Sequence, residues 1–310
     1  MNYENYIKEL VKNDERFIII TAENRAAIRN LPEEIGEQFV DVGIAEQTMV
    51  GMAAGLALRG RIPVIHALAT FLTMRAFEFI RTDVGIGNLP VKIVGSVAGF
   101  LSEANGPTHQ SLEDISLMRG IPNVNVFCPA DEQDLLIGLK KVLESPSPFY
   151  IRYTNVKPIF SHTTDFEIGK AEIIGDGSEE IIILTYGLMF NEDLKARDIL
   201  QQKGFSIGLV NLRTLKTIDK NLIINILNNS SLVFMLEDHF LTGGLFSIIA
   251  EIAAEENVNA NIFPIALKNK WFKPLLLENL LSYEKFDCFS IVEKIEYALK
   301  NMNKIVNYYY

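Results

Sequence analysis

The chain has 310 residues, of which 48% are hydrophobic and 22% are charged, and its formal net charge is −10. This length is typical of about two domains, and the acidic balance argues against a nucleic-acid partner, which requires a basic surface. No apolar run approaches the ~20 residues that cross a bilayer, and the charged N-terminus does not resemble a signal peptide, so we expect a soluble cytoplasmic α/β protein with no membrane contact.

The first half of the chain alternates short apolar runs with segments of helical pattern. Continuous β-branched runs are typical of strands that are covered on both faces. We expect strands near residues 17–20, 39–42, 62–65, 91–94, 124–127 and 149–152. We expect helices over residues 47–58, 73–82, 112–118 and 132–143, with Gly60 just past the end of the first. This alternation predicts a mostly parallel sheet with helices on both faces.

The composition changes after Arg152. Residues 155–177 are irregular, with prolines, threonines and glycines, so we place a linker at 161–177 between a domain at 1–160 and a domain at 178–310. Alternation then resumes, with strands near 180–184, 206–210, 232–236 and 261–265 and helices over 192–203 and 245–255. The sequence therefore predicts two consecutive, mostly parallel-sheet α/β domains.

Glu46 is the first candidate for chemistry. A glutamate in the first turn of a helix is ordinarily a solvated residue that the helix dipole favours. Here the following turns carry an unusually small surface, made by Gly51, Ala53, Ala54, Gly55 and Ala57. Small residues allow close approach of a sheet, a ligand or another subunit, so Glu46 is a candidate for a desolvated carboxylate that shares a proton.

Two further segments of the first half combine polar and aromatic residues. Residues 70–77 read Thr-Phe-Leu-Thr-Met-Arg-Ala-Phe, which on its own fits a strand end followed by an amphipathic helix. Residues 106–110 read Gly-Pro-Thr-His-Gln, and the Gly-Pro turn presents His109 where a loop meets a helix. A lone histidine is more often structural than catalytic, but this position faces a cleft more readily than His66, His162 or His239 would.

Together these three segments resemble the pyrimidine-binding half of the transketolase family, which uses thiamin diphosphate. The match is densest in Val42-Gly43-Ile44-Ala45-Glu46-Gln47 and in Gly106 to Gln110. The resemblance implies that Glu46 hydrogen-bonds N1′ of the aminopyrimidine and that Phe71 stacks on that ring. It implies cofactor-binding positions at Ile44, Glu46, Phe71, Met74 and Phe77. It also implies that His109 contacts the substrate near the reacting carbonyl, and that both Glu46 and His109 are catalytic.

The later part of the chain resembles the C-terminal domain of the same family. A strand that ends in Glu237-Asp238-His239 is followed by Gly243-Gly244. We interpret these residues as structural or interface residues.

The chain departs from the family pattern at the substrate positions. Asn105 replaces an aspartate that reads a substrate hydroxyl, and Val97 and Asn155 fall where the family keeps a histidine and an arginine for phosphate. Together with His109, these are the substrate-binding positions that the resemblance assigns. Loss of two cations would remove most charge-assisted phosphate binding, so we expect an unphosphorylated or nucleotide-linked sugar.

The family's Gly-Asp-Gly…Asn segment, which binds diphosphate and a divalent metal, is not found in this sequence. The resemblance therefore implies a split enzyme in which a separate N-terminal subunit binds the diphosphate and Mg²⁺ or Ca²⁺, in an α2β2 heterotetramer acting on small sugars. The alternatives are a pyruvate–aldehyde condensing enzyme of the deoxyxylulose-phosphate synthase type, the β subunit of a 2-oxoacid dehydrogenase, and a non-catalytic regulatory subunit. Metal ligands are not expected in this chain.

Overall fold

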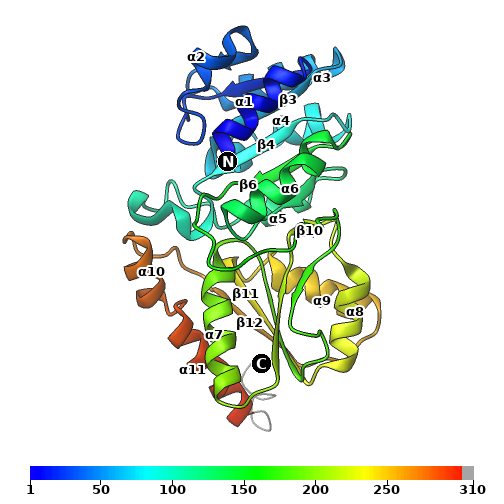
Figure 1. The fold of residues 1–310 in the computed structure, drawn as a ribbon, viewed down its shortest axis with the longest axis vertical. Coiled ribbons are helices and arrows are strands. Elements are labelled where there is room, and N and C mark those ends of the chain that lie inside the picture. The colour runs from blue at the N-terminus through cyan, green and yellow to red at the C-terminus, as the bar shows by residue number, and fades with distance from the viewer. Residues whose placement is uncertain (302–310) are drawn as a thin grey trace.

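The structure is a computed structural model that describes residues 1–301. Two sheets follow one another along the long axis of the molecule, the first built mainly from the first half of the chain (Figure 1). Each sheet is covered by helices on both faces. The expected fold class, two mostly parallel α/β domains, is confirmed.

The first sheet is parallel except at one edge. Its seven strands lie in the order β10 (Thr214–Lys216), β5 (Asn125–Phe127), β6 (Phe149–Arg152), β4 (Lys92–Ser96), β3 (Ile62–Leu68), β1 (Phe17–Thr21) and β2 (Phe39–Asp41). At the β2 edge of the sheet, Ile19 of β1 is opposite Val64 of β3 and Phe39 of β2. The edge strand β10 pairs antiparallel with β5. Since β10 comes from the second half of the chain, the two halves share this sheet.

Successive strand residues of the first sheet enter two different cores. Ile19 packs on one face with α1 (Tyr3–Asn13), α2 (Leu31–Ile35) and α6 (Glu132–Glu144). Ile20 packs on the other face, with α3 (Glu46–Leu58) and α5 (Asp114–Arg119). Both isoleucines are fully buried. Burial on both faces explains why these strands read as continuous apolar runs rather than as alternating ones.

A wound segment after β3 is not the regular α-helix expected over residues 73–82. It consists of η2 (Phe71–Arg75), α4 (Phe77–Phe79) and η3 (Ile80–Gly85), of which η2 and η3 are π-helical. The Ala76 N–H donates to the carbonyl of Phe71, five residues back, at 3.2 Å. A widened turn of this kind occurs frequently at functional sites, and it re-aims the side chains that follow Phe71.

The second sheet has five strands, in the order β12 (Ile262–Leu267), β11 (Leu232–Phe240), β8 (Ile181–Thr185), β9 (Ile207–Asn211) and β7 (Glu172–Ile174). Helices α7 (Phe190–Gln202) and α11 (Cys288–Lys300) cover one face, and α8 (Lys220–Asn229) and α9 (Leu245–Glu255) cover the other (Figure 1). Helix α10 (Leu277–Glu284) packs against η4 (Gly99–Asn105) of the first half. Short 3-10 turns complete the chain at η1 (Gly36–Gln38) and η5 (Gly187–Met189).

Strand β7 lies inside the segment that the sequence predicts as a linker, residues 161–177. It pairs antiparallel with β9 and buries Glu172 and Ile174 while Ile173 stays exposed. A three-residue edge strand is too short to give a readable alternation, which is why its pattern was not distinguishable from a loop.

Candidate active site

Glu46 is placed by a turn that requires glycine. Strand β2 ends at Asp41, and Gly43 adopts a φ of +70°, which residues with a side chain rarely adopt. The Gly43 N–H donates to Oδ1 of Asp41 at 3.0 Å, and helix α3 begins at Glu46. The carboxylate therefore lies at the N-terminus of a helix, where the helix dipole favours negative charge. Its side chain is only 2% exposed.

This carboxylate lines a cavity of about 550 Å³ at the carboxyl ends of β1 and β3. Ile44 and Phe71 line the same cavity, so it unites three of the residues predicted for cofactor binding. Its other lining residues are Ala22, Glu23, Asn24, Arg25, Ala26, Arg29 and Leu68. Crevices at this end of parallel strands are the usual ligand sites of open α/β sheets.

His109 joins the site through an aromatic contact. Its ring meets that of Phe71 edge-on, with centroids 5.3 Å apart. Its Nδ1 lies 3.0 Å from the hydroxyl of Thr108, which leaves Nε2 without a hydrogen bond among the described residues. The structure therefore brings together Glu46, Phe71 and His109, which are more than 60 residues apart at their extremes in the chain.

Two of the predicted cofactor residues do not line this cavity. Met74 is 39% exposed, and the Thr70 hydroxyl lies 3.6 Å from its sulfur. Phe77 is half-buried and packs against the core beneath α3.

The three predicted substrate positions other than His109 lie on two loops that follow strands. Asn105 is exposed and donates to the carbonyl of Ser102 at 2.9 Å. Val97 follows β4 and has a φ of +62°. Asn155 follows β6 and is exposed. The Asn24 amide donates to the Ser96 hydroxyl at 3.1 Å, so the cavity loop after β1 lies directly beside Val97.

Three arginines at the site were not assigned a role from the sequence. Arg75 donates from one nitrogen, Nη1, to both oxygens of Glu46, at 2.9 and 2.8 Å. Arg25 binds Asp41 through Nε at 3.0 Å, and Arg29 is exposed with no ion pair among residues 1–301. Each lies within a loop or a π-helical segment that pattern reasoning places poorly. A charged residue four positions after Phe71 was the one readable signal for Arg75.

The cavity suits the aminopyrimidine half of thiamin diphosphate. It offers a buried carboxylate as a hydrogen-bond acceptor and an aromatic face for a flat heterocycle. The Glu46 carboxylate and the Phe71 ring fit the aminopyrimidine ring of the cofactor. Among the described residues, the carboxylates that line the cavity are those of Glu23 and Glu46.

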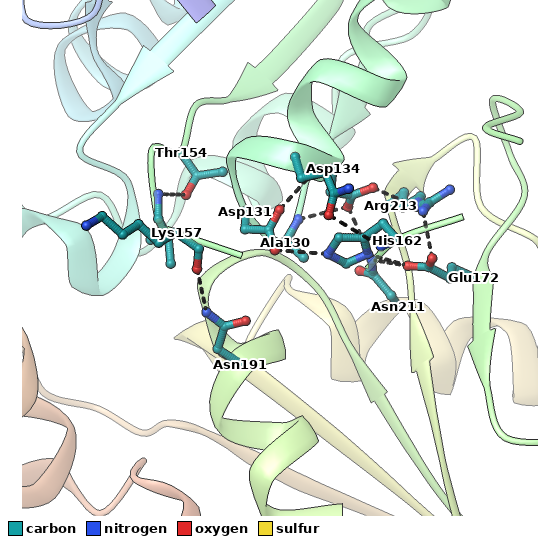
Figure 2. A network of polar contacts seen from close by, with 12 residues as sticks. Ala130, Asp131, Asp134, Thr154, Lys157, His162, Glu172, Asn191, Asn211 and Arg213 are labelled. Carbon is teal, nitrogen blue, oxygen red and sulfur yellow. Dashed lines mark hydrogen bonds and ion pairs between the residues drawn. The ribbon is translucent and has the colours of Figure 1, made fainter. Parts of the chain in front are cut away.

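A buried polar cluster lies elsewhere, between the two halves of the chain (Figure 2). His162 lies between Asp131 and Glu172, at 3.0 and 2.7 Å. Arg213 bridges Asp134 and Glu172, at 2.7 and 2.9 Å. Ligand atoms of Asp134, His162 and Glu172 lie within 4.8 Å of one another, but the Arg213 guanidinium already compensates two of these charges. We therefore interpret the cluster as an ion-pair network that joins the domains.

The pKa values in this network are strongly shifted. Burial opposes charging of His162, but hydrogen bonds with Asp131 and Glu172 outweigh it and raise the pKa of His162 to about 9. Burial likewise opposes charging of Glu172, but bonds from His162 and the Thr163 N–H outweigh it and lower its pKa to about 2. Opposite charges thus hold His162 and Glu172 in the ionised state.

A second buried ion cluster joins the halves at Arg152. Its Nε binds Asp114 at 2.9 Å, and its Nη1 binds Asp238 at the end of β11. All three side chains are at most 5% exposed. Asp238 therefore has a structural partner in this chain.

A larger cavity, of about 940 Å³, lies at the ends of β11 and β12 and contains none of the predicted site residues. Phe240, Trp271 and Lys270 are among its lining residues. None of the helices in residues 1–301 combines the length and apolar character needed to span a bilayer.

The fold and the cavity define a two-domain α/β protein with a cavity at the carboxyl ends of parallel strands, where such folds commonly bind ligands. Residues 2–157 match the pyrimidine binding domain of transketolases, and residues 169–291 match the transketolase C-terminal domain. The chain belongs to the transketolase family, as the sequence motifs predict, and membership implies thiamin diphosphate as cofactor.

Several curated relatives are similar over nearly the whole chain. A protein of Methanocaldococcus jannaschii described as a transketolase C-terminal section is 33% identical over 96% of this chain and 95% of its own length. The 6-deoxy-6-sulfo-D-fructose transketolase subunit SqwH of a Clostridium species is 33% identical, covering 82% of this chain and 80% of the relative. A 1-deoxy-D-xylulose-5-phosphate synthase of Dictyoglomus thermophilum is 35% identical over 95% of this chain, which spans 49% of that enzyme.

Solved structures give the same fold. A split-gene transketolase, described as an inactive β4 tetramer, superposes with a TM-score of 0.83 at 30% identity and covers 96% of both chains. A transketolase of Pichia stipitis superposes with a TM-score of 0.80 at 17% identity, and this chain matches 46% of it. The second likeness shows the fold alone.

Proposed function

We propose that this chain is the C-terminal subunit of a split, thiamin diphosphate-dependent transketolase that transfers a two-carbon ketol unit between sugars. The observation that carries the proposal is the shared cavity, in which the buried carboxylate of Glu46 faces Phe71 and Phe71 contacts His109. Glu46 and His109 are the catalytic residues in this proposal.

Thiamin diphosphate, when bound, supplies the nucleophilic carbon and the electron sink for this transfer. Glu46 shares a proton with N1′ of the aminopyrimidine, and burial keeps water from competing for that hydrogen bond. Phe71 offers its ring face, and Ile44 forms an apolar wall of the cavity. The free Nε2 of His109 can exchange a proton with a substrate oxygen.

The diphosphate and its Mg²⁺ or Ca²⁺ would be held by a separate N-terminal subunit in an α2β2 heterotetramer of the cytoplasm. Support comes from exposed apolar side chains on adjoining elements: Ile44, which lines the cavity, is 71% exposed, and Ile86, which follows η3, is 70% exposed. Met52, Met74 and Phe79 are each 39% exposed on the same adjoining elements. An apolar surface that borders an active site is typical of a subunit interface.

The substrate is expected to differ from that of ordinary transketolases. Val97 and Asn155 stand where the family has cations for phosphate, and each lost charged hydrogen bond is worth roughly 1.5–3 kcal/mol. The structure adds two cations from another loop, because Arg25 and Arg29 line the cavity next to Val97. We therefore propose that the substrate is an atypical sugar. If that sugar carries an anionic end group, Arg29 is the residue that binds it. The sulfonated sugar in the name of one relative is consistent with such a group.

A condensation of pyruvate with an aldehyde is the second candidate, favoured by the similarity to deoxyxylulose-phosphate synthases. The β subunit of a 2-oxoacid dehydrogenase and a non-catalytic subunit fit less well. Glu46 and Phe71 line one cavity and the His109 ring contacts Phe71, and this arrangement argues for retained chemistry.

The test is reconstitution of this chain with a diphosphate-domain subunit. The isolated chain is expected to bind thiamin diphosphate poorly and to be inactive, and the complex to be active with magnesium. Tight magnesium-dependent binding by the isolated chain would refute the division of labour.

Substrate choice is tested by kcat/KM of the complex on xylulose 5-phosphate, on sulfonated, unphosphorylated and nucleotide-linked sugars, and on pyruvate with an aldehyde. Turnover of xylulose 5-phosphate at the level of an ordinary transketolase would refute an atypical substrate. Arg29→Gln should raise KM for an anionic sugar and leave KM for an uncharged one unchanged.

A further inference from the structure

Arg75 occupies the space between the activating carboxylate and the stacking ring. Its Nη1 hydrogen-bonds both oxygens of Glu46, at 2.9 and 2.8 Å. Its guanidinium carbon lies 4.1 Å from the centre of the Phe71 ring. The guanidinium is planar, so in this chain a flat, hydrogen-bonding group already fills the gap that Glu46 and Phe71 define.

These two contacts are the same two that the aminopyrimidine would make. A flat heterocycle in this site needs the face of Phe71 for stacking and an oxygen of Glu46 as an acceptor. With the Arg75 guanidinium on both of its oxygens, the Glu46 side chain is only 2% exposed, so the acceptor that the ring needs is covered in this chain. The guanidinium and the aminopyrimidine therefore compete for one place.

The Arg75 side chain is free enough to move away from Glu46. This side chain is 39% exposed, and within residues 1–301 its hydrogen bonds are to Glu46 and its cation–π contact is with Phe71. Arg75 ends the π-helical turn η2 and directly follows Met74, which is 39% exposed. A charged, partly exposed side chain of this kind can rotate into water at low cost, whereas the buried carboxylate cannot follow it.

We propose that Arg75 is a built-in, displaceable occupant of the aminopyrimidine site, which binds Glu46 and Phe71 in the cofactor-free chain and moves out when the cofactor enters. The proposal rests on the proposed function. It has a chemical consequence: the buried carboxylate always has a hydrogen-bond donor, first the guanidinium and then the cofactor ring. An uncompensated buried charge is thereby avoided at every stage.

The first experiment uses the isolated chain and does not depend on the cofactor. Thermal unfolding is measured for Glu46→Gln, Arg75→Met and the double variant, with the exposed Arg59→Met as a matched control at the other end of α3. The Glu46 and Arg75 substitutions should be clearly non-additive, whereas Glu46 and Arg59 should be additive. Additive effects of Glu46 and Arg75 would overturn the proposed contact.

The second experiment measures the dissociation constant of thiamin diphosphate in the reconstituted complex by calorimetry with magnesium. Arg75→Met should bind the cofactor about tenfold more tightly than the wild type, since no bond to Glu46 has to be broken first. Arg75→Lys keeps the charge but not the planar group and should lie between the two. Arg59→Met should match the wild type.

The outcomes separate this inference from the proposed function. Weaker or unchanged binding by Arg75→Met, with normal binding by the wild type, overturns the displacement and leaves the transketolase assignment intact. Absence of cofactor binding by both complexes overturns both.

Discussion

Two carboxylate–cation clusters of this chain are built differently. The network between the domains contains Asp131, Asp134, His162, Glu172 and Arg213, all buried and joined by several bonds each. The cavity cluster has one carboxylate, Glu46, and one partly exposed arginine. In the network between the domains, each charged group is held by several buried partners and cannot easily rearrange. In the cavity cluster, Glu46 can exchange its arginine for a ligand. Multiple buried partners give rigidity, and a single exposed partner gives replaceability.

The largest expected effect concerns the chemistry of Glu46. Glu46→Gln removes the proton-sharing carboxylate and should slow hydrogen exchange at C2 of bound thiamin diphosphate by orders of magnitude in the reconstituted complex. Stability should change little, because Arg75 can turn to solvent. Wild-type exchange in this variant would show that Glu46 is not the activating residue.

The opposite result is expected in the domain network. Glu172→Gln leaves Arg213 and His162 without their shared carboxylate and should lower the free energy of unfolding by about 3–5 kcal/mol. Thiamin diphosphate binding by the folded complex should be unaffected. Denaturant unfolding of the two variants side by side checks the contrast, and equal stability of Glu46→Gln and Glu172→Gln would remove it.

The network should also make stability depend on pH. The pKa of His162 is raised to about 9 from an ordinary 6.5, so its contribution is full below pH 6.5 and is lost as the pH rises through 9. Each pKa unit corresponds to about 1.4 kcal/mol, so the shift of His162 sets an upper limit of about 3.5 kcal/mol on this contribution.

The measurement is the difference in unfolding free energy between pH 6 and pH 9.5, for the wild type and for His162→Gln. The variant serves as the reference because burial lowers the pKa of Lys92 to about 7, which changes stability in the opposite direction. An identical pH dependence of both proteins would contradict the assignment.

The smallest effect is expected on the exposed surface of α3. A Cβ at Gly55 would meet no atom within 4 Å, so Gly55→Ala should stabilise the isolated chain by about 0.5–1 kcal/mol. Gly55→Leu should fold equally well but fail to assemble with a partner if α3 is an interface. Sedimentation of the mixed subunits provides the readout, and normal assembly of Gly55→Leu would exclude this face.

Sequence patterns predicted the long elements of the sheet well. Helix α3 and strands β1 and β6 differ from their expected limits by one residue at most, because burial on both faces writes a clear apolar run. Strands β7 and β10 were not predicted, since three residues show no period. Sequence motifs identified Glu46, Phe71 and His109. The positions of the Arg75 and Arg29 side chains depend on a π-helical turn and on a loop, and no sequence pattern predicts the side-chain directions in such segments.

The antiparallel pairing of β10 with β5 has a consequence for protein engineering. The transketolase C-terminal match begins at residue 169, yet Thr214–Lys216 completes the sheet of the preceding unit. A graft or truncation made at residues 161–177 would remove this strand and uncover the edge of β5. Open strand edges promote association between chains. Proteins in which these two units are exchanged separately should therefore aggregate, unless residues 214–216 are kept with the N-terminal unit.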